Sequence, residues 1–189
     1  MAMNIQAGSV DGRQRRYNGG MILLHWLTAF LVVFLFLTAQ IWDFVERGGA
    51  LRHGLQSLHV ACGLLLALVF LARVTWRILS AGDLPPKERG IVGLLAEGAH
   101  YLLYLGLVAQ IVLGFLWRWA QGKAVDVFGY LSIPDFVGVN TDYRHMFGEL
   151  HENLAWAIIA LAGVHAVAAI YHHAVLKDGV LLKMMPSKP

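Results

Sequence analysis

Four long apolar runs set the strongest limit on what this chain can fold into. They cover about residues 21–42, 54–78, 93–119 and 148–176 of the 189. An α-helix needs about 20 apolar residues to cross the ~30 Å hydrocarbon layer of a membrane, and each run is that long. A soluble bundle would place polar residues every few positions along each helix, and these runs do not. The sequence therefore predicts an all-α integral membrane protein, a four-helix bundle with one domain.

Charged residues make up only 14% of the chain and lie mostly between the runs. Lys and Arg are concentrated on the cytoplasmic side of membrane proteins. One concentrated set contains Arg13, Arg15, Arg16, Arg77, Lys87, Arg89, Lys177, Lys183 and Lys188; the opposite side carries Arg47, Arg52, Arg118, Lys123 and Arg144, diluted and mixed with acids. We therefore expect both termini in the cytoplasm, with a mobile tail at 1–20 and an amphipathic tail at 177–189. The basic residues that give the net charge of +3 are placed as expected for orienting the chain in the membrane. We therefore do not take this charge as a sign of nucleic-acid binding.

The single cysteine, Cys62, lies inside the second run, so no disulfide forms within the chain. No CxxCH motif offers covalent haem attachment. About twenty polar residues precede the first run, which is longer than the apolar part of a secretory signal. We expect this first span to be retained.

Histidines inside the apolar runs are the main functional signal. His151 and His165 are fourteen positions apart, which places them on one helix face about 21 Å apart. By depth, His25 matches His165 near the inner surface and His59 matches His151 near the outer surface. Ionisable groups within a membrane are costly and are usually functional. Two imidazoles from different helices leave no open position on a haem iron, which suits electron transfer. The spacing predicts two non-covalent haem b groups.

Other residues near these layers have more than one interpretation. His100 lies at the depth of His165 and is a competing ligand, a propionate partner or a proton donor at a quinone site. Arg73 and Arg77 share a face, where they either reach lipid headgroups or contact a propionate or quinone. The same histidines would also suit zinc, copper or iron ions. We favour haem because the middle of the bundle is almost purely apolar.

The segment between Arg118 and Arg144 is the longest outer connection and contains FGYLSIPDFVGVN. It is too apolar for a simple solvated linker, and long loops in compact proteins are usually functional or disordered. We expect it to fold over the outer end of the bundle as a lid.

Several blocks resemble the bacterial cytochrome b561 family of small four-span dihaem proteins. These are LHWL around His25, LHVACG around His59, LHENLAW at His151, GVHAVAAIYHH at His165, and the terminal KDGVLLKMMP. Similar ligand spacing occurs in cytochrome b subunits of membrane formate dehydrogenases and hydrogenases. The resemblance covers most of the chain from Met21 onward. It implies His25 with His165 and His59 with His151 as axial ligand pairs, and makes His100 a neighbouring or quinone-site residue.

The best understood family members oxidise superoxide. The resemblance therefore implies a bacterial inner-membrane superoxide:ubiquinone oxidoreductase that contacts lipid, quinone and superoxide. Cations at the outer mouth would attract a small anion, or else anchor the protein at the interface. Those cations are Arg47, Arg52, Arg118, Lys123 and Arg144, and the inner-side quinone or propionate candidates are His100, Arg73, Arg77, Tyr101 and His172.

Two other functions remain open at this point. The first is a haem-b membrane anchor that relays electrons for a separate dehydrogenase partner. The second is a haem-free histidine metal transporter. A redox partner protein would copurify in the first case, and a haem spectrum would be missing in the second.

Overall fold

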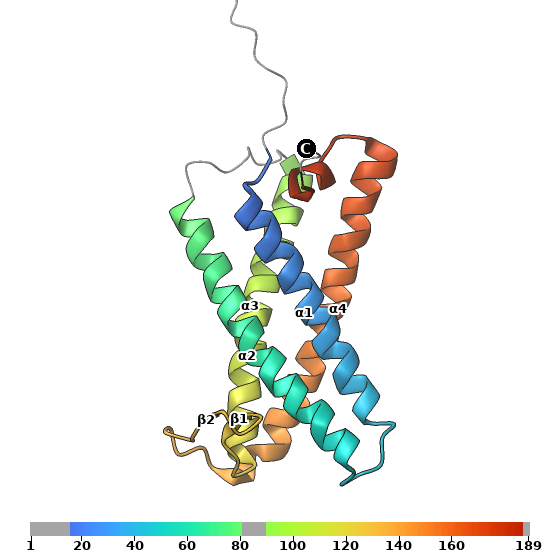
Figure 1. Ribbon diagram of the computed structural model, residues 1–189. Coiled ribbons are helices and arrows are strands. Elements are labelled where there is room, and N and C mark those ends of the chain that lie inside the picture. The colour runs from blue at the N-terminus through green and yellow to red at the C-terminus, as the bar shows by residue number, and fades with distance from the viewer. Residues whose placement is uncertain (1–15, 81–89, 187–189) are drawn as a thin grey trace, which may run out of the picture.

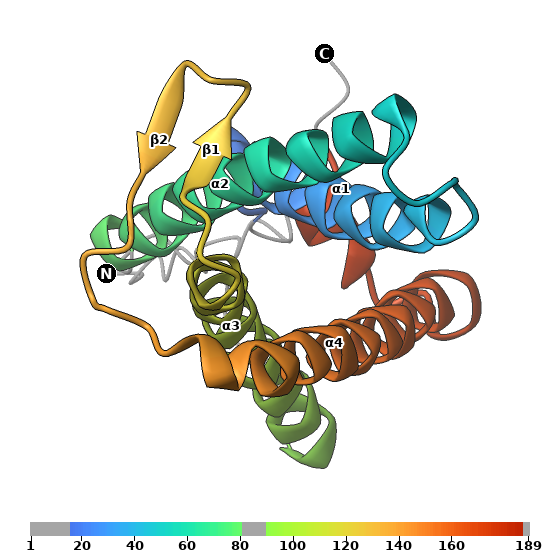
Figure 2. The same cartoon turned by 90° about the horizontal axis from the view of Figure 1, so that it is seen from below.

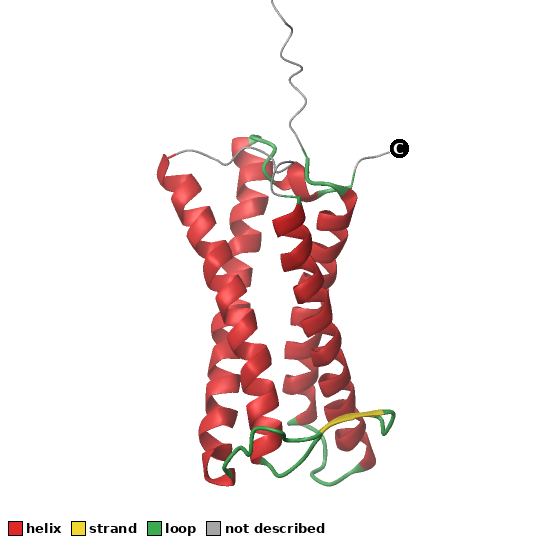
Figure 3. Cartoon of the chain, turned by 90° about the vertical axis from the view of Figure 1, so that its left-hand side faces the viewer, coloured by secondary structure: helices red, strands yellow, loops and turns green. Residues whose placement is uncertain are grey.

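Four long helices run up and down in a computed structural model that describes residues 16–80 and 90–186 (Figure 1). They are α1 (Gly19–Trp42), α2 (Ala50–Leu79), α3 (Gly90–Ala120) and α4 (Arg144–Tyr171). Each of the four is long and apolar enough to cross a membrane, the last one counted as Thr141–Leu176. The all-α four-helix membrane architecture predicted from the sequence is confirmed (Figure 3). The expected tail at 1–15, the basic residues Lys87 and Arg89, and Lys188 lie outside the described residues.

The helices pack as two antiparallel pairs, α1 along α2 and α3 along α4 (Figure 2). The buried core that joins the pairs lies near mid-height and consists of Leu31, Leu35, Leu66, Val69, Phe70, Leu107 and Ile158. α3 and α4 approach closely at Gly106, where an added Cβ would lie 3.2 Å from Ile158. Small residues allow such an approach between membrane helices. Large apolar side chains cover the outside, as expected of a surface that faces lipid.

The turn between α1 and α2 is short and is closed by Arg52 from the first turn of α2. Its guanidinium donates hydrogen bonds to the carbonyl oxygens of Trp42 and Val45. It also pairs with Asp43 at 3.3 Å. The Trp42 carbonyl lies at the C-terminus of α1, where carbonyl groups have no partner within the helix. These contacts hold the ends of α1 and α2 together.

The connection between α3 and α4 contains a small antiparallel hairpin, β1 (Val125–Val127) and β2 (Leu131–Ile133). Gly129 turns the chain at φ +79°, a conformation that favours glycine. The indole of Trp119 at the end of α3 donates a hydrogen bond to the carbonyl of Ile133. The hairpin lies at the end of the bundle opposite the described termini, beside α2 and α3 (Figures 1 and 2). That it covers a haem stays a prediction.

The C-terminal segment folds back onto the start of α1. A π-helical turn (His172–Leu176) and a 3-10 turn (Leu181–Met184) follow α4. The indole Nε1 of Trp26 donates a hydrogen bond to the Met184 carbonyl at 2.8 Å. The amide of Tyr17 donates to the Lys183 carbonyl at 3.1 Å. The described termini therefore meet at one end of the bundle (Figure 1).

Candidate functional site

At the hairpin end, His59 of α2 faces His151 of α4. Their ring centroids are 6.4 Å apart, and the ring planes are inclined by 69°. Trp42 lies 5.0 Å from the His59 ring, and Trp117 lies 5.7 Å from the His151 ring. These indoles enclose the two imidazoles, which we call the hairpin-side pair.

At the other end, His25 of α1 faces His165 of α4. Their centroids are 6.5 Å apart with planes inclined by 73°. This termini-side pair lies about 21 Å along α4 from the hairpin-side pair, from the helical rise over fourteen residues. The structure therefore brings together the same two pairs of histidines that were matched by depth in the sequence, each pair drawn from two different helices.

The separation within each pair suits a metal held between the rings. Two imidazole–metal bonds of about 2 Å, with the half-widths of the two rings, add up to a centroid separation of about 6.3 Å. The values of 6.4 and 6.5 Å agree with this sum. In residues 16–80 and 90–186, no group of three or more His, Cys, Asp or Glu side chains is placed to hold a metal ion. Two imidazoles alone suit a metal that brings its other ligands with it, as the iron of a porphyrin does.

Glycines make room beside the hairpin-side pair. Gly63 follows His59 by one helical turn, and a Cβ added there would meet no atom within 4 Å. Gly114 of α3 lies against His151, where an added Cβ would be 3.3 Å from the ring atom Cε1. The open space at Gly63 and the close approach of Gly114 to His151 are compatible with a flat group held between the His59 and His151 rings.

A third imidazole, that of His100, lies in the termini-side layer. Its centroid is 5.0 Å from that of His165, so these two rings are in direct contact. That separation is shorter than the ~6.3 Å needed for a metal between two imidazoles. Of the two histidines near His165, His25 therefore has the separation that suits a ligand pair.

Arg73 of α2 reaches into the same layer. Its Nη2 lies 2.9 Å from Nδ1 of His25, and its guanidinium carbon lies 5.2 Å from the centre of the Tyr104 ring. Arg77 lies one turn further along α2 and is half-buried. Arg73 is therefore the arginine that the structure brings to the termini-side pair.

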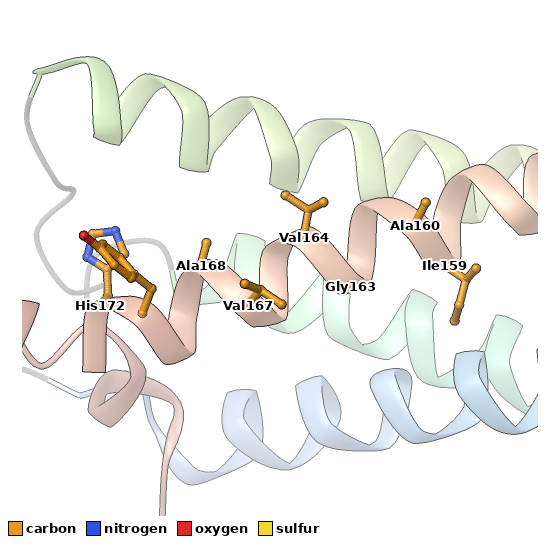
Figure 4. A pocket seen from close by; sticks show the side chains of 8 residues that line it. Ile159, Ala160, Gly163, Val164, Val167, Ala168 and His172 are labelled. Carbon is orange, nitrogen blue, oxygen red and sulfur yellow. The ribbon is translucent and has the colours of Figure 1, made fainter. Parts of the chain in front are cut away.

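Tyr101 and His172 lie apart from the pair. Tyr101 follows His100 on α3, but its side chain is 69% exposed on the outer surface of the bundle. His172 hydrogen-bonds Asp178 through Nδ1, and this bond holds the pKa of the Asp178 carboxyl below its usual value. A shallow groove of about 580 Å³ ends at His172 (Figure 4). It is lined by Ile159, Ala160, Gly163, Val164, Val167, Ala168, Tyr171 and His172.

The five predicted cations at the hairpin end divide into two kinds. Arg52 is engaged in the α1–α2 turn, and Arg118 donates a hydrogen bond to the Ala124 carbonyl at 3.2 Å. Arg47, Lys123 and Arg144 are exposed. Of the five, these three have exposed side chains for which the described part of the chain shows no hydrogen bond.

Two polar residues inside the spans were missed by sequence reasoning. Thr38 of α1 is buried, and its Oγ1 lies 3.2 Å from Nδ1 of His59. Gln110 of α3 donates a hydrogen bond through Nε2 to the His151 carbonyl at 3.0 Å. Polar residues are uncommon inside membrane helices, and that rarity is the signal that would have found them.

Comparison with known proteins gives a consistent answer along nearly the whole chain. Residues 16–187 match the family described as prokaryotic cytochrome b561. Cytochrome b561 homolog 2 of Escherichia coli is 32% identical, covering 94% of this chain and 95% of the relative. The probable superoxide oxidase CybB of Yersinia pestis is 28% identical, covering 92% and 98%. Cytochrome b562 of Cereibacter sphaeroides is 31% identical, covering 89% and 94%.

The family match spans all four helices and both histidine pairs, and members of this family bind haem b. The chain therefore belongs to the prokaryotic cytochrome b561 family, as a multi-pass membrane protein of electron transfer.

Proposed function

We propose that this protein binds two b haems and transfers electrons from superoxide to ubiquinone across the bacterial inner membrane. The observation that carries this proposal is the presence of two imidazole pairs at metal-spanning separation, 6.4 and 6.5 Å between centroids. His59 and His151 would hold one haem, and His25 and His165 the other. Each haem supplies a one-electron carrier, and bis-imidazole ligation leaves its iron closed to oxygen.

The hairpin end is proposed as the outer, electron-accepting end. Lysine and arginine counts favour the termini on the cytoplasmic side, which leaves the hairpin outside. The exposed Arg47, Lys123 and Arg144 would raise the local concentration of a small anion there. The Yersinia pestis relative that carries the name of a probable superoxide oxidase supports superoxide as the donor. Arg52 and Arg118 add charge to this end from fixed positions.

The termini end is proposed as the quinone-reducing end. The overall reaction takes two superoxide anions, one ubiquinone and two protons to two O₂ molecules and one ubiquinol. The protons must come from groups that connect the membrane with water. We assign this role to His172, which lies at the end of the groove on α4 (Figure 4), together with its hydrogen-bond partner Asp178. His100, whose ring contacts that of His165, is a second candidate. The apolar lining of the groove suits a prenylated quinone.

The test is an absorption spectrum of the detergent-purified protein during enzymatic generation of superoxide. We expect the haem bands to become reduced and then to reoxidise when ubiquinone is added. Superoxide dismutase must abolish the reduction, because otherwise another reductant is responsible. A haem spectrum indifferent to superoxide would contradict this donor and favour the relay of electrons for a separate dehydrogenase.

A further inference from the structure

The Nδ1 atoms of His59 and His25 have chemically different partners. At His59 the partner is the hydroxyl of Thr38, 3.2 Å away. That hydroxyl donates its single hydrogen to the Leu35 carbonyl at 2.9 Å. Towards His59 it is therefore an acceptor, and it selects the tautomer with the proton on Nδ1. Nε2 of His59 is left with a free lone pair for a metal.

At His25 the partner is the Arg73 guanidinium, 2.9 Å from Nδ1. A guanidinium only donates hydrogen bonds and stays charged in proteins. Among the described residues, its guanidinium carbon also lies 5.2 Å from the centre of the neutral Tyr104 ring. The Nδ1 atom of His25 thus has a cation, Arg73, as its partner. The Nδ1 atom of His59 has a neutral hydroxyl, that of Thr38.

These two partners would shift the reduction potentials of the two haems in opposite directions, and both shifts widen the difference between the sites. An acceptor for Nδ1–H makes the imidazole a more basic ligand, which favours oxidised iron at the hairpin-side pair. A nearby cation favours reduced iron, because reduction removes one positive charge from the site. The first effect lowers one reduction potential, and the second raises the other.

We propose that Thr38 and Arg73 rank the two haem sites, so that the termini-side site has the higher reduction potential. An electron that enters at the hairpin side would then pass to the site beside Arg73, which would leave the hairpin-side site oxidised and the termini-side site reduced. The two residues are positioning and tuning groups, since neither ligates the metal. This inference rests on the proposed function, which supplies the two haems.

Haem ligation changes the contact at His25 but not the sign of the effect. If Nε2 of His25 bound the iron, the imidazole proton would be on Nδ1, and the Arg73 guanidinium could then no longer donate to that atom. Its charge remains in the layer, where a haem carboxylate is a suitable partner. Removing Arg73 then leaves that carboxylate without its cation. In either arrangement the loss of Arg73 makes the termini-side site harder to reduce.

The test is an optical redox titration of the full-length, haem-loaded protein. We expect two waves in the unmodified protein, which His59→Ala and His165→Ala assign by removing one haem each. In Arg73→Gln we expect the termini-side wave at a lower potential and the hairpin-side wave unchanged. In Arg73→Lys, which keeps the charge, the termini-side wave returns towards its original potential. Thr38→Val, which keeps the shape but loses the acceptor, shifts the hairpin-side wave upward, and Thr38→Ser does not.

Unshifted waves in Arg73→Gln and Thr38→Val, with both haems retained, would overturn this inference and leave the proposed function standing. If Arg73→Gln loses a haem, Thr38→Val against Thr38→Ser still decides, and an unshifted hairpin-side wave overturns it. An unmodified protein with fewer than two haems would overturn both the inference and the proposed function. A hairpin-side wave at the higher potential would also contradict the ranking.

Discussion

The imidazoles of His59 and His151 face each other from α2 and α4 with their centroids 6.4 Å apart. His25 and His165 repeat this relationship at 6.5 Å at the other end of the bundle. One helix therefore contributes to both pairs, and its two partners come from the opposite helix pair. A group held between such rings would also connect the α1–α2 pair with the α3–α4 pair.

Replacing single ligands should remove single haems. His59→Ala or His151→Ala should reduce the haem content by about half and leave the termini-side spectrum, since one imidazole does not replace the second axial bond. His25→Ala or His165→Ala should do the converse. Haem content per chain and low-temperature spectra measure this. His173→Ala, an exposed histidine just beyond α4, is the matched control and should keep both haems. Full haem content in any of the four ligand variants would remove that residue from the set.

Bulk at Gly114 should disturb the hairpin-side pair. An added Cβ lies 3.3 Å from Cε1 of His151, so the branched side chain in Gly114→Val forces the ring or α3 to move. Overpacking of this kind costs about 1–3 kcal/mol. We expect selective loss of the hairpin-side haem, measured by spectrum and by thermal unfolding in detergent. Gly98→Val, on the same helix, meets nothing within 4 Å at its Cβ and serves as the control. Equal haem loss in both variants would point to a general helix effect instead.

The exposed cations at the hairpin end should accelerate the encounter with superoxide. Replacing Arg47, Lys123 and Arg144 together by Gln should lower the second-order rate of haem reduction by about three- to tenfold at low ionic strength. The difference should shrink at high salt, because a Debye length of about 3 Å at 1 M screens exposed charges. Stopped-flow reduction at two salt concentrations measures it. Arg16→Gln, at the opposite end, should leave the rate unchanged. A rate loss that is insensitive to salt would argue against steering.

The Asp178 carboxylate should hold the C-terminal segment in place above acid pH. Its hydrogen bond with His172 lowers its pKa, so the folded state favours the deprotonated form. The resulting stabilisation is present above the unfolded pKa of about 3.9 and is lost as the pH falls through the lowered folded value. Amide hydrogen exchange over residues 177–186 should therefore accelerate only in strong acid. Asp178→Asn should show fast exchange already at neutral pH, and unchanged exchange there would contradict this role.

The sequence predicted the architecture well because lipid imposes a simple requirement on each span. It predicted the helix ends less well. α2 begins at Ala50, before the apolar run, because Arg52 uses its first turn to close the α1–α2 connection. α4 begins at Arg144 because a 3-10 turn, Thr141–Tyr143, leads into it. The hairpin strands are three residues each, too short to show an alternating pattern.

In the site, counting depth along the apolar runs grouped the histidines into two layers, but it left both His25 and His100 as candidate partners of His165. It was insufficient for the residues around them, because side-chain contacts depend on how each helix is rotated and crossed. Tyr101 is adjacent to His100 in sequence, yet the helical rotation of about 100° per residue places its side chain on the exposed outer surface of the bundle. Thr38 and Arg73 reach their histidines only through the packing of α1 against α2. The periodicity of apolar residues along a helix does not predict such side-chain contacts between helices.

The haem-to-chain ratio of the purified protein, with the haem released by acid–acetone extraction, decides whether the two histidine pairs are ligands. We predict two haems per chain, both extractable as b-type, with a six-coordinate low-spin spectrum from bis-imidazole ligation. One haem per chain, or a high-spin spectrum with an open coordination position, would contradict the two histidine pairs as ligands. No haem, from cells that supply it, would contradict haem binding altogether.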